Sequence, residues 1–331
     1  MAAPGRAGSI PSGSASASGR SSGTRPCSSA ATASCATAPR AVSPLTTPMT
    51  VPSQAASQVS LDLHITGEAR TVTAACASGT EAIGAAIDRI RYGRVDVALA
   101  GGAEAVVTPA IMASFAAMRA LSTHAPADGS SPSRPFGKDR DGFVNGEGAG
   151  VLVLEAEEHA RARGARIYCE AAGWGLSADA HHMAAPDPSG AGVALAVRRA
   201  VRDAGGHVVD VVHVNAPCHG RRCRGRSSRR RRTLRAVLRA AGRARSPRSR
   251  GILGHLQGRP VGSRPWRTVL TLHHGVVRAD RGGWGESDDA LGLDVVAGGS
   301  AGYAGERGSR ALSKLVRVWR AHAVLALRRV G

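Results

Sequence analysis

The chain has 331 residues, of which 43% are hydrophobic and 21% are charged, and this composition excludes a wholly disordered protein. No stretch approaches the ~18 consecutive apolar residues of a membrane-spanning helix, and the first 60 residues have no apolar segment of the signal-peptide kind. The six cysteines are scattered, with no Cys-x-x-Cys pair, so the sequence predicts reduced thiols, no metal site and a cytoplasmic location.

The net charge of +20 is concentrated in the last third of the chain. Residues 214–331 carry 26 basic and 6 acidic side chains, and the segment 221–250 alone holds 14 arginines. Such a segment is typical of a nucleic-acid-binding arm, because arginine pairs with phosphates and stacks on bases. Few aromatic residues are interleaved and no nucleic-acid reader motif is present, so an Arg-rich nucleic-acid binder is the less favoured alternative.

Helix and strand signals alternate through the middle of the chain, after a Ser/Ala/Gly/Thr-rich start without periodicity. This alternation, with apolar strands, predicts an α/β layered fold. The first helix begins at residue 78 and carries Ile83, Ile87 and Ile90, and strands are predicted at 95–100 and 150–154. A helix at 155–163, which Gly164 ends, and a strand at 166–171 follow. The next helix carries Val193, Val197 and Val201 and ends at 205–206, a strand follows at 208–214, and strand-like runs lie at 268–277 and 323–329.

Cys76 lies among small residues, in VTAACASGT, directly before the first of these helices. Ser78 and Glu81 have the spacing of a capping box, which predicts that the helix begins there. Unpaired amides and the helix dipole at such a position stabilise a thiolate, so Cys76 is a candidate nucleophile, and its small neighbours leave room for a long thioester substrate. From position alone, the alternative is that Cys76 is a small buried hydrophobic residue.

Several long stretches resemble the β-ketoacyl-acyl carrier protein synthases of the thiolase superfamily, especially the discrete elongating type known as synthase II. The similar stretches are 73–84 (TAACASGTEAIG), 96–104 (DVALAGGAE), 115–123 (FAAMRALST), 134–150 (RPFGKDRDGFVNGEGAG) and 179–190 (DAHHMAAPDPSG). The resemblance covers about residues 39–214. It implies an α/β, thiolase-like layered αβαβα fold, with the N-terminal half best preserved and the C-terminal half degraded.

The resemblance also implies a reaction, a decarboxylative condensation in fatty-acid or polyketide synthesis. Cys76 would accept an acyl chain from an acyl carrier protein, malonyl carrier protein would lose carbon dioxide, and the carbanion would attack the thioester to give a 3-ketoacyl product. No resident cofactor is implied, since phosphopantetheine arrives on the carrier protein. Family members are usually homodimers, and residues 95–102 would lie at the dimer interface.

Two histidines complete the site that the resemblance implies, where they favour decarboxylation and stabilise the enolate. The second is His255, in GHLQG at 254–258. The first is His219, although Pro217 and Cys218 displace it from the Asn-Ala pair that it should follow. The family's lysine would fall on Arg250, and residues 314–322 (KLVRVWRAH) replace the gating loop.

Stretches that fit the family alternate with stretches rich in Arg, Gly and Ser, as in a GC-rich coding sequence read out of frame. We therefore predict frame-shifted text at about 4–38, 217–253, 278–290 and 314–322, in which case the basic charge indicates no nucleic-acid partner. The chain then divides into a low-complexity segment (1–38), an N-terminal half with the nucleophile (39–214), an Arg-rich insert (215–253) and a partial C-terminal half (254–331). The alternative for function is an inactive condensing-enzyme remnant.

Overall fold

The structure is a computed structural model that describes most of the chain between residues 40 and 330. The described residues are 40, 42–127, 132–134, 137–182, 187, 189–215, 246–247, 254–255, 265–278, 295–296, 300–302, 310–316 and 321–330. The predicted low-complexity segment 1–38 lies outside these residues, and so does nearly all of the Arg-rich segment 215–253.

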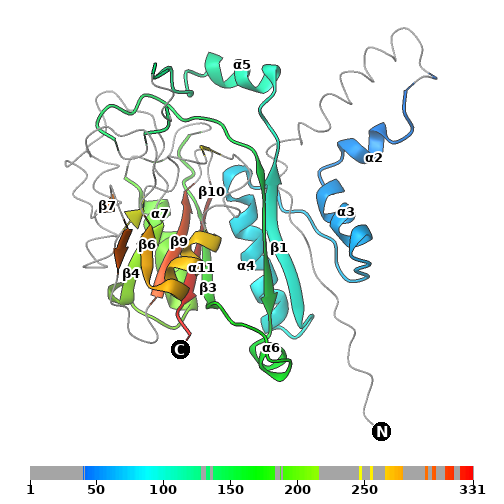
Figure 1. The fold of residues 1–331 in the computed structure, drawn as a ribbon, viewed down its shortest axis with the longest axis vertical. Helices are drawn as coiled ribbons and strands as arrows, with labels where there is room; N and C mark the ends of the chain where they lie inside the picture. The colour runs from blue at the N-terminus through cyan, green and yellow to red at the C-terminus, as the bar shows by residue number, and fades with distance from the viewer. Residues whose placement is uncertain are drawn as a thin grey trace.

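Two β-sheets lie on opposite sides of one central helix (Figure 1). The larger sheet has the strand order β3-β10-β9-β4, in which only the β4-β9 pair is parallel. The smaller sheet pairs β1 and β2 antiparallel. Helix α4 contacts both sheets, and α7 covers the other face of the larger sheet, which gives the layered α/β arrangement that the sequence predicts. The bounds are β1 (Val97–Glu104), β2 (Gly148–Glu155), β3 (Glu170–Ala178), β4 (Val211–Asn215), β9 (Arg310–Val316), β10 (Ala321–Arg328), α4 (Ser78–Arg91) and α7 (Ala191–Asp203).

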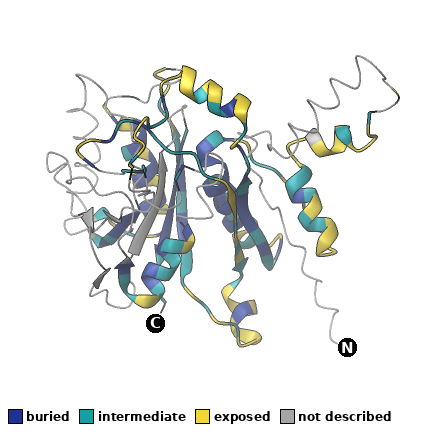
Figure 2. Ribbon diagram, turned by 45° about the horizontal axis from the view of Figure 1, so that its top comes forward, coloured by how far each residue is buried: buried dark blue, intermediate teal, exposed yellow. Residues whose placement is uncertain are grey.

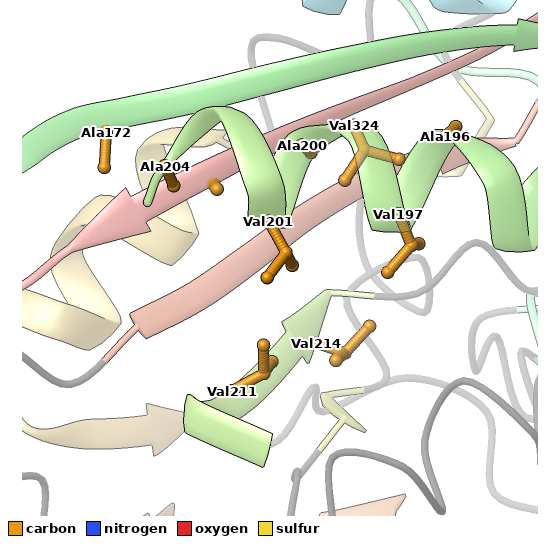
Figure 3. Packing of buried hydrophobic residues seen from close by; sticks show 10 residues of the cluster. Ala172, Ala196, Val197, Ala200, Val201, Ala204, Val211, Val214 and Val324 are labelled. Atoms are coloured by element: carbon orange, nitrogen blue, oxygen red, sulfur yellow. The ribbon is translucent and has the colours of Figure 1, made fainter. Parts of the chain in front are cut away.

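Strand β10 lies inside the larger sheet, and its side chains point alternately to the two faces of the sheet. Val324 and Ala326 belong to the core beneath α7, which Figure 3 shows from close by. Leu325 packs against the core of α4, and Leu327 packs against α11 (Pro265–His274). Because both faces of the strand are covered, its sequence is almost continuously apolar rather than alternating.

The remaining elements lie around these layers. Figure 2 shows that α5 is mostly exposed, whereas the residues of α4, β1 and β10 are largely buried. The bounds of these remaining elements are α2 (Thr46–Thr50), α3 (Gln54–Asp62), α5 (Pro109–Ala117), α6 (Glu157–Ala162), β5 (Ser246–Pro247), β6 (Val276–Arg278), β7 (Val295–Val296) and β8 (Ser300–Gly302).

The predicted strand at 268–277 is wrong, and the one predicted at 166–171 overlaps β3 only at residues 170–171. Most of the run 268–277 forms α11, and only its last residues belong to β6. The β-branched and leucine-rich composition favoured a strand, but Thr268, Thr271 and Leu272 are buried with the i, i+3, i+4 spacing of a helix face. Pro265 begins the helix, at a position where its missing N–H costs nothing.

A buried pair of side chains joins the start of β10 to the loop that follows β3. His322 Nε2 and Asp179 Oδ1 lie 2.6 Å apart, and both side chains are almost wholly buried. The second oxygen of Asp179 accepts a hydrogen bond from the N–H of Asp187.

Parts of the predicted frame-shifted segment 314–322 form the facing ends of β9 and β10. The hypothesis that this segment is read out of frame stays a prediction.

Candidate active site

Cys76 lies in a tight turn that leads directly into α4. The turn is the 3-10 helix η2 (Ala75–Ala77), closed by a 3.0 Å hydrogen bond from the N–H of Ala77 to the carbonyl of Ala74. Ala75 has a φ of 44°, in the left-handed region that costs a non-glycine residue roughly 1–2 kcal/mol. Such strain is typical of functional sites, where the surrounding structure must hold it in place.

The predicted capping box at the start of α4 is wrong. Ala77 is the N-cap, and no side chain caps the helix. The Ser78 hydroxyl instead points back to the turn, where it donates to the carbonyl of Ala75 at 2.6 Å and accepts the N–H of Ala74 at 2.8 Å. Glu81 still lies in the first turn of α4, where its charge is favourable to the helix dipole.

His255 lies against the sulfur of Cys76. Its Nε2 atom is 3.6 Å from Sγ, within hydrogen-bonding range for sulfur, and each residue is only 5% exposed. A neutral imidazole with a bare Nε2 accepts the proton of the thiol, whereas Nε2–H donates to the thiolate. The structure therefore brings together two of the three residues that the sequence predicts for the site. The third, His219, lies outside the described residues, as does Arg250.

The backbone of His255 is fixed by the segment that precedes β2. The N–H of His255 donates to the carbonyl of Val144 at 2.5 Å, and the N–H of Gly146 donates back to the carbonyl of His255 at 3.1 Å. These two bonds form a parallel bridge between His255 and Asn145. The histidine is therefore held by segments far from it in sequence.

Two aromatic rings support the imidazole, and neither phenylalanine is among the predicted site residues. Phe143 meets His255 edge to face, with the ring centroids 4.8 Å apart, and Phe115 of α5 meets Phe143 in the same manner at 5.4 Å. Both phenylalanines lie within stretches that resemble the family, at 115–123 and 134–150, and this was the one available signal. Such contacts restrict the imidazole to one ring orientation.

A charged cluster holds the loop that presents Phe143. Burial alone would raise the pKa of Asp141, but hydrogen bonds from Ser122, Thr123 and Arg134 outweigh it and hold the pKa well below the usual range. A lowered pKa means that the ionised carboxylate stabilises the fold at neutral pH. This contribution disappears as the pH falls through the folded-state pKa.

Small apolar side chains surround the Cys76 sulfur. Ala74, Ala77 and Ala323 form one buried cluster with Cys76, and Leu176 packs against it. The sulfur is thus almost wholly shielded from solvent, and the site combines a nucleophile with a group that donates or accepts a proton. Such a pair can form and break a thioester.

Cys169 provides a contrast within the same protein. Burial, followed by the charge of Glu170, raises the pKa of this thiol to about 12. At pH 8 only about one molecule in 10⁴ then carries its thiolate, because each unit of pKa is a factor of ten. We expect iodoacetamide to label Cys76 at pH 8 and to leave Cys169 intact, as peptide mass spectrometry would show. Labelling of both at similar rates in the folded protein would contradict the arrangement described.

Comparisons with known proteins identify the family of the chain. The N-terminal domain of the beta-ketoacyl synthases matches residues 6–160, and their C-terminal domain matches residues 168–281. The chain belongs to the β-ketoacyl synthase family. The 3-oxoacyl-[acyl-carrier-protein] synthase 2 proteins of Staphylococcus aureus and of Vibrio cholerae serotype O1 are each 47% identical to it over 182 residues. That alignment covers 55% of this chain but only 44% and 43% of these relatives, respectively, so it spans less than half of their length.

Solved structures of ketosynthases share the fold. A type II polyketide ketosynthase in complex with its acyl-carrier protein is 26% identical, with a TM-score of 0.85 over 98% of this chain and 78% of that one. A β-ketoacyl synthase from Burkholderia phymatum is 28% identical, with a TM-score of 0.83 over 99% and 78% of the two chains. The predicted thiolase-like fold is thereby confirmed. Among its described residues, no helix is both long and apolar enough to cross a membrane.

Proposed function

We propose that the protein is an acyltransferase that condenses an acyl thioester with malonyl-acyl carrier protein, with loss of carbon dioxide, to a 3-ketoacyl product. The observation that carries this proposal is the 3.6 Å contact between Cys76 Sγ and His255 Nε2 at the start of α4. Membership of the β-ketoacyl synthase family supports the same chemistry.

The first step is the transfer of the acyl chain to Cys76. The thiolate attacks the carbonyl carbon of the acyl carrier thioester, a new carbon–sulfur bond forms, and the carrier thiol leaves with the proton that Cys76 lost. The first amides of α4 and the imidazole of His255 favour the thiolate. The dry alanine-lined surroundings of the sulfur protect the thioester from hydrolysis.

The second step forms the carbon–carbon bond. Malonyl carrier protein loses carbon dioxide, and the enolate that remains attacks the thioester carbonyl, so that the Cys76 thiolate leaves and 3-ketoacyl carrier protein is released. One proton is taken up overall. A hydrogen bond from Nε2–H of His255 to the enolate oxygen would stabilise this intermediate in a site of low dielectric. We assign the second such donor to His219.

The partners and the setting of the reaction follow from the same proposal. An acyl carrier protein is the partner, and a structural neighbour that is a ketosynthase bound to its carrier protein supports this. We propose a homodimer with 95–102 at its interface, no resident cofactor or metal, and a cytoplasmic location. The scattered cysteines, without a Cys-x-x-Cys pair, support a reducing compartment.

The test is a condensation assay on the full chain with acyl and malonyl carrier proteins. We expect an acyl mass increase on Cys76 and a 3-ketoacyl product, both absent from Cys76→Ala and both retained by the control Cys169→Ala. Acylation without product would identify the chain as a condensing-enzyme remnant. The absence of both acylation and product would overturn the proposal. Steeply salt-dependent DNA binding would then favour the nucleic-acid alternative.

A further inference from the structure

Ser78 is the first residue of α4 and is wholly buried, and its side chain bonds back to the turn that carries Cys76. Its hydroxyl makes two hydrogen bonds, one with the carbonyl of Ala75 and one with the N–H of Ala74. The backbone N–H of Ser78 also donates to the carbonyl of Ala75. This carbonyl therefore accepts two hydrogen bonds from one residue.

These bonds fix the residue that directs the nucleophile. Ala75 has the left-handed φ of 44°, which an alanine leaves readily unless other contacts hold it. The peptide that joins Ala75 to Cys76 follows any rotation at Ala75, and the sulfur moves with it. A shift of the sulfur away from His255 would break the 3.6 Å contact.

We propose that Ser78 is a positioning residue for Cys76, whose hydroxyl holds Ala75 in its left-handed conformation and so keeps the sulfur directed at His255. The inference rests on the proposed function in taking Cys76 as the nucleophile. A serine at this position therefore serves the reactive turn rather than the cap of α4.

The chemistry of the side chain makes the proposal specific. Alanine at residue 78 leaves the buried N–H of Ala74 without its acceptor and the partly buried carbonyl of Ala75 with one donor fewer. The turn then relaxes towards an ordinary φ at Ala75. Threonine retains a hydroxyl that makes the same two bonds, so Ser78→Thr is the conservative variant.

The experiment measures the rate at which iodoacetamide labels Cys76 as a function of pH, by peptide mass spectrometry on the full chain. We expect Ser78→Ala to slow labelling at neutral pH by about ten- to hundredfold, because a thiol that loses its stabilising contacts carries correspondingly less thiolate at that pH. The half-maximal rate should also move towards pH ~8.5, where an ordinary cysteine ionises. Ser78→Thr should keep the wild-type profile.

Ser60→Ala is the matched control, because Ser60 also donates to a backbone carbonyl, that of Ile65 at 2.6 Å, but does so in α3. It should leave the Cys76 profile unchanged. Cys169 reports on folding, since unfolding exposes it to the reagent. If the reagent labels Cys169 rapidly in Ser78→Ala, that variant is unfolded and Ser78→Thr provides the test. A slow, shifted Cys76 profile in Ser78→Thr then overturns the proposal.

A Ser78→Ala protein that keeps Cys169 protected and shows the wild-type Cys76 profile also overturns the proposal. The labelling needs no carrier protein, so its outcome is separate from that of the condensation assay. If the wild type fails to condense while Ser78→Ala slows labelling, the proposed function fails and the role of Ser78 stands. If the wild type condenses and Ser78→Ala labels normally, only the role of Ser78 fails.

Discussion

Replacement of His255 by alanine should reduce condensation by on the order of 10²–10⁴-fold, the usual contribution of a positioned proton donor or acceptor. Transfer of the acyl chain to Cys76 should fall by much less. The two steps differ because the amides at the start of α4 favour the thiolate even without the imidazole, whereas the enolate depends on Nε2–H. In the proposed reaction, the 3.6 Å contact of His255 with the sulfur would place Nε2 near the thioester carbon that the enolate attacks.

The two steps can be measured separately. Intact mass after incubation with acyl carrier protein alone reports acylation, and carbon dioxide release from malonyl carrier protein reports the second step. His273→Ala is the matched control, because His273 also contacts an aromatic ring, that of Tyr168 at 5.0 Å, but it lies in α11. Equal losses in both steps would instead assign His255 to the thiol proton of Cys76.

The elements around the site were predictable where one local pattern decided them. Val193, Val197 and Val201 mark one face of α7, and all three are buried against the larger sheet. The apolar run at 323–329 predicted β10, because a strand covered on both faces has no polar positions. The helix that begins at Ser78 was predicted for the wrong reason, since no side chain caps it. The same pattern, a serine with a glutamate three residues later, is compatible with a capping box and with a serine hydroxyl that bonds back into the preceding turn.

The site itself was predictable only in part. A cysteine before a helix is visible in the sequence, but Cys76 and His255 are 179 positions apart and no periodicity of the sequence joins them. Only the resemblance to the family paired the two residues. The edge-to-face contacts of Phe143 and the backbone bridge at Asn145 depend on how distant loops meet. Tertiary packing of this kind leaves no local pattern.

Gly254 should tolerate no side chain, and Gly254→Ala should reduce condensation by on the order of 100-fold through a displaced His255. Its φ of 66° lies in the left-handed region, and a Cβ would lie 2.8 Å from the carbonyl oxygen of Val144. That carbonyl accepts the N–H of His255, so relief of the clash must break or stretch this bond. The imidazole then moves away from the sulfur of Cys76.

Gly164→Ala separates the two costs of this substitution. Gly164 has nearly the same φ, 67°, but its Cβ would meet nothing within 4 Å. This control should lose roughly 1–2 kcal/mol of stability for the backbone conformation and keep its activity. Chemical denaturation and the condensation assay on both variants make the comparison. If Gly254→Ala lost stability equally and still condensed at the wild-type rate, the backbone of His255 would not set the geometry of the site.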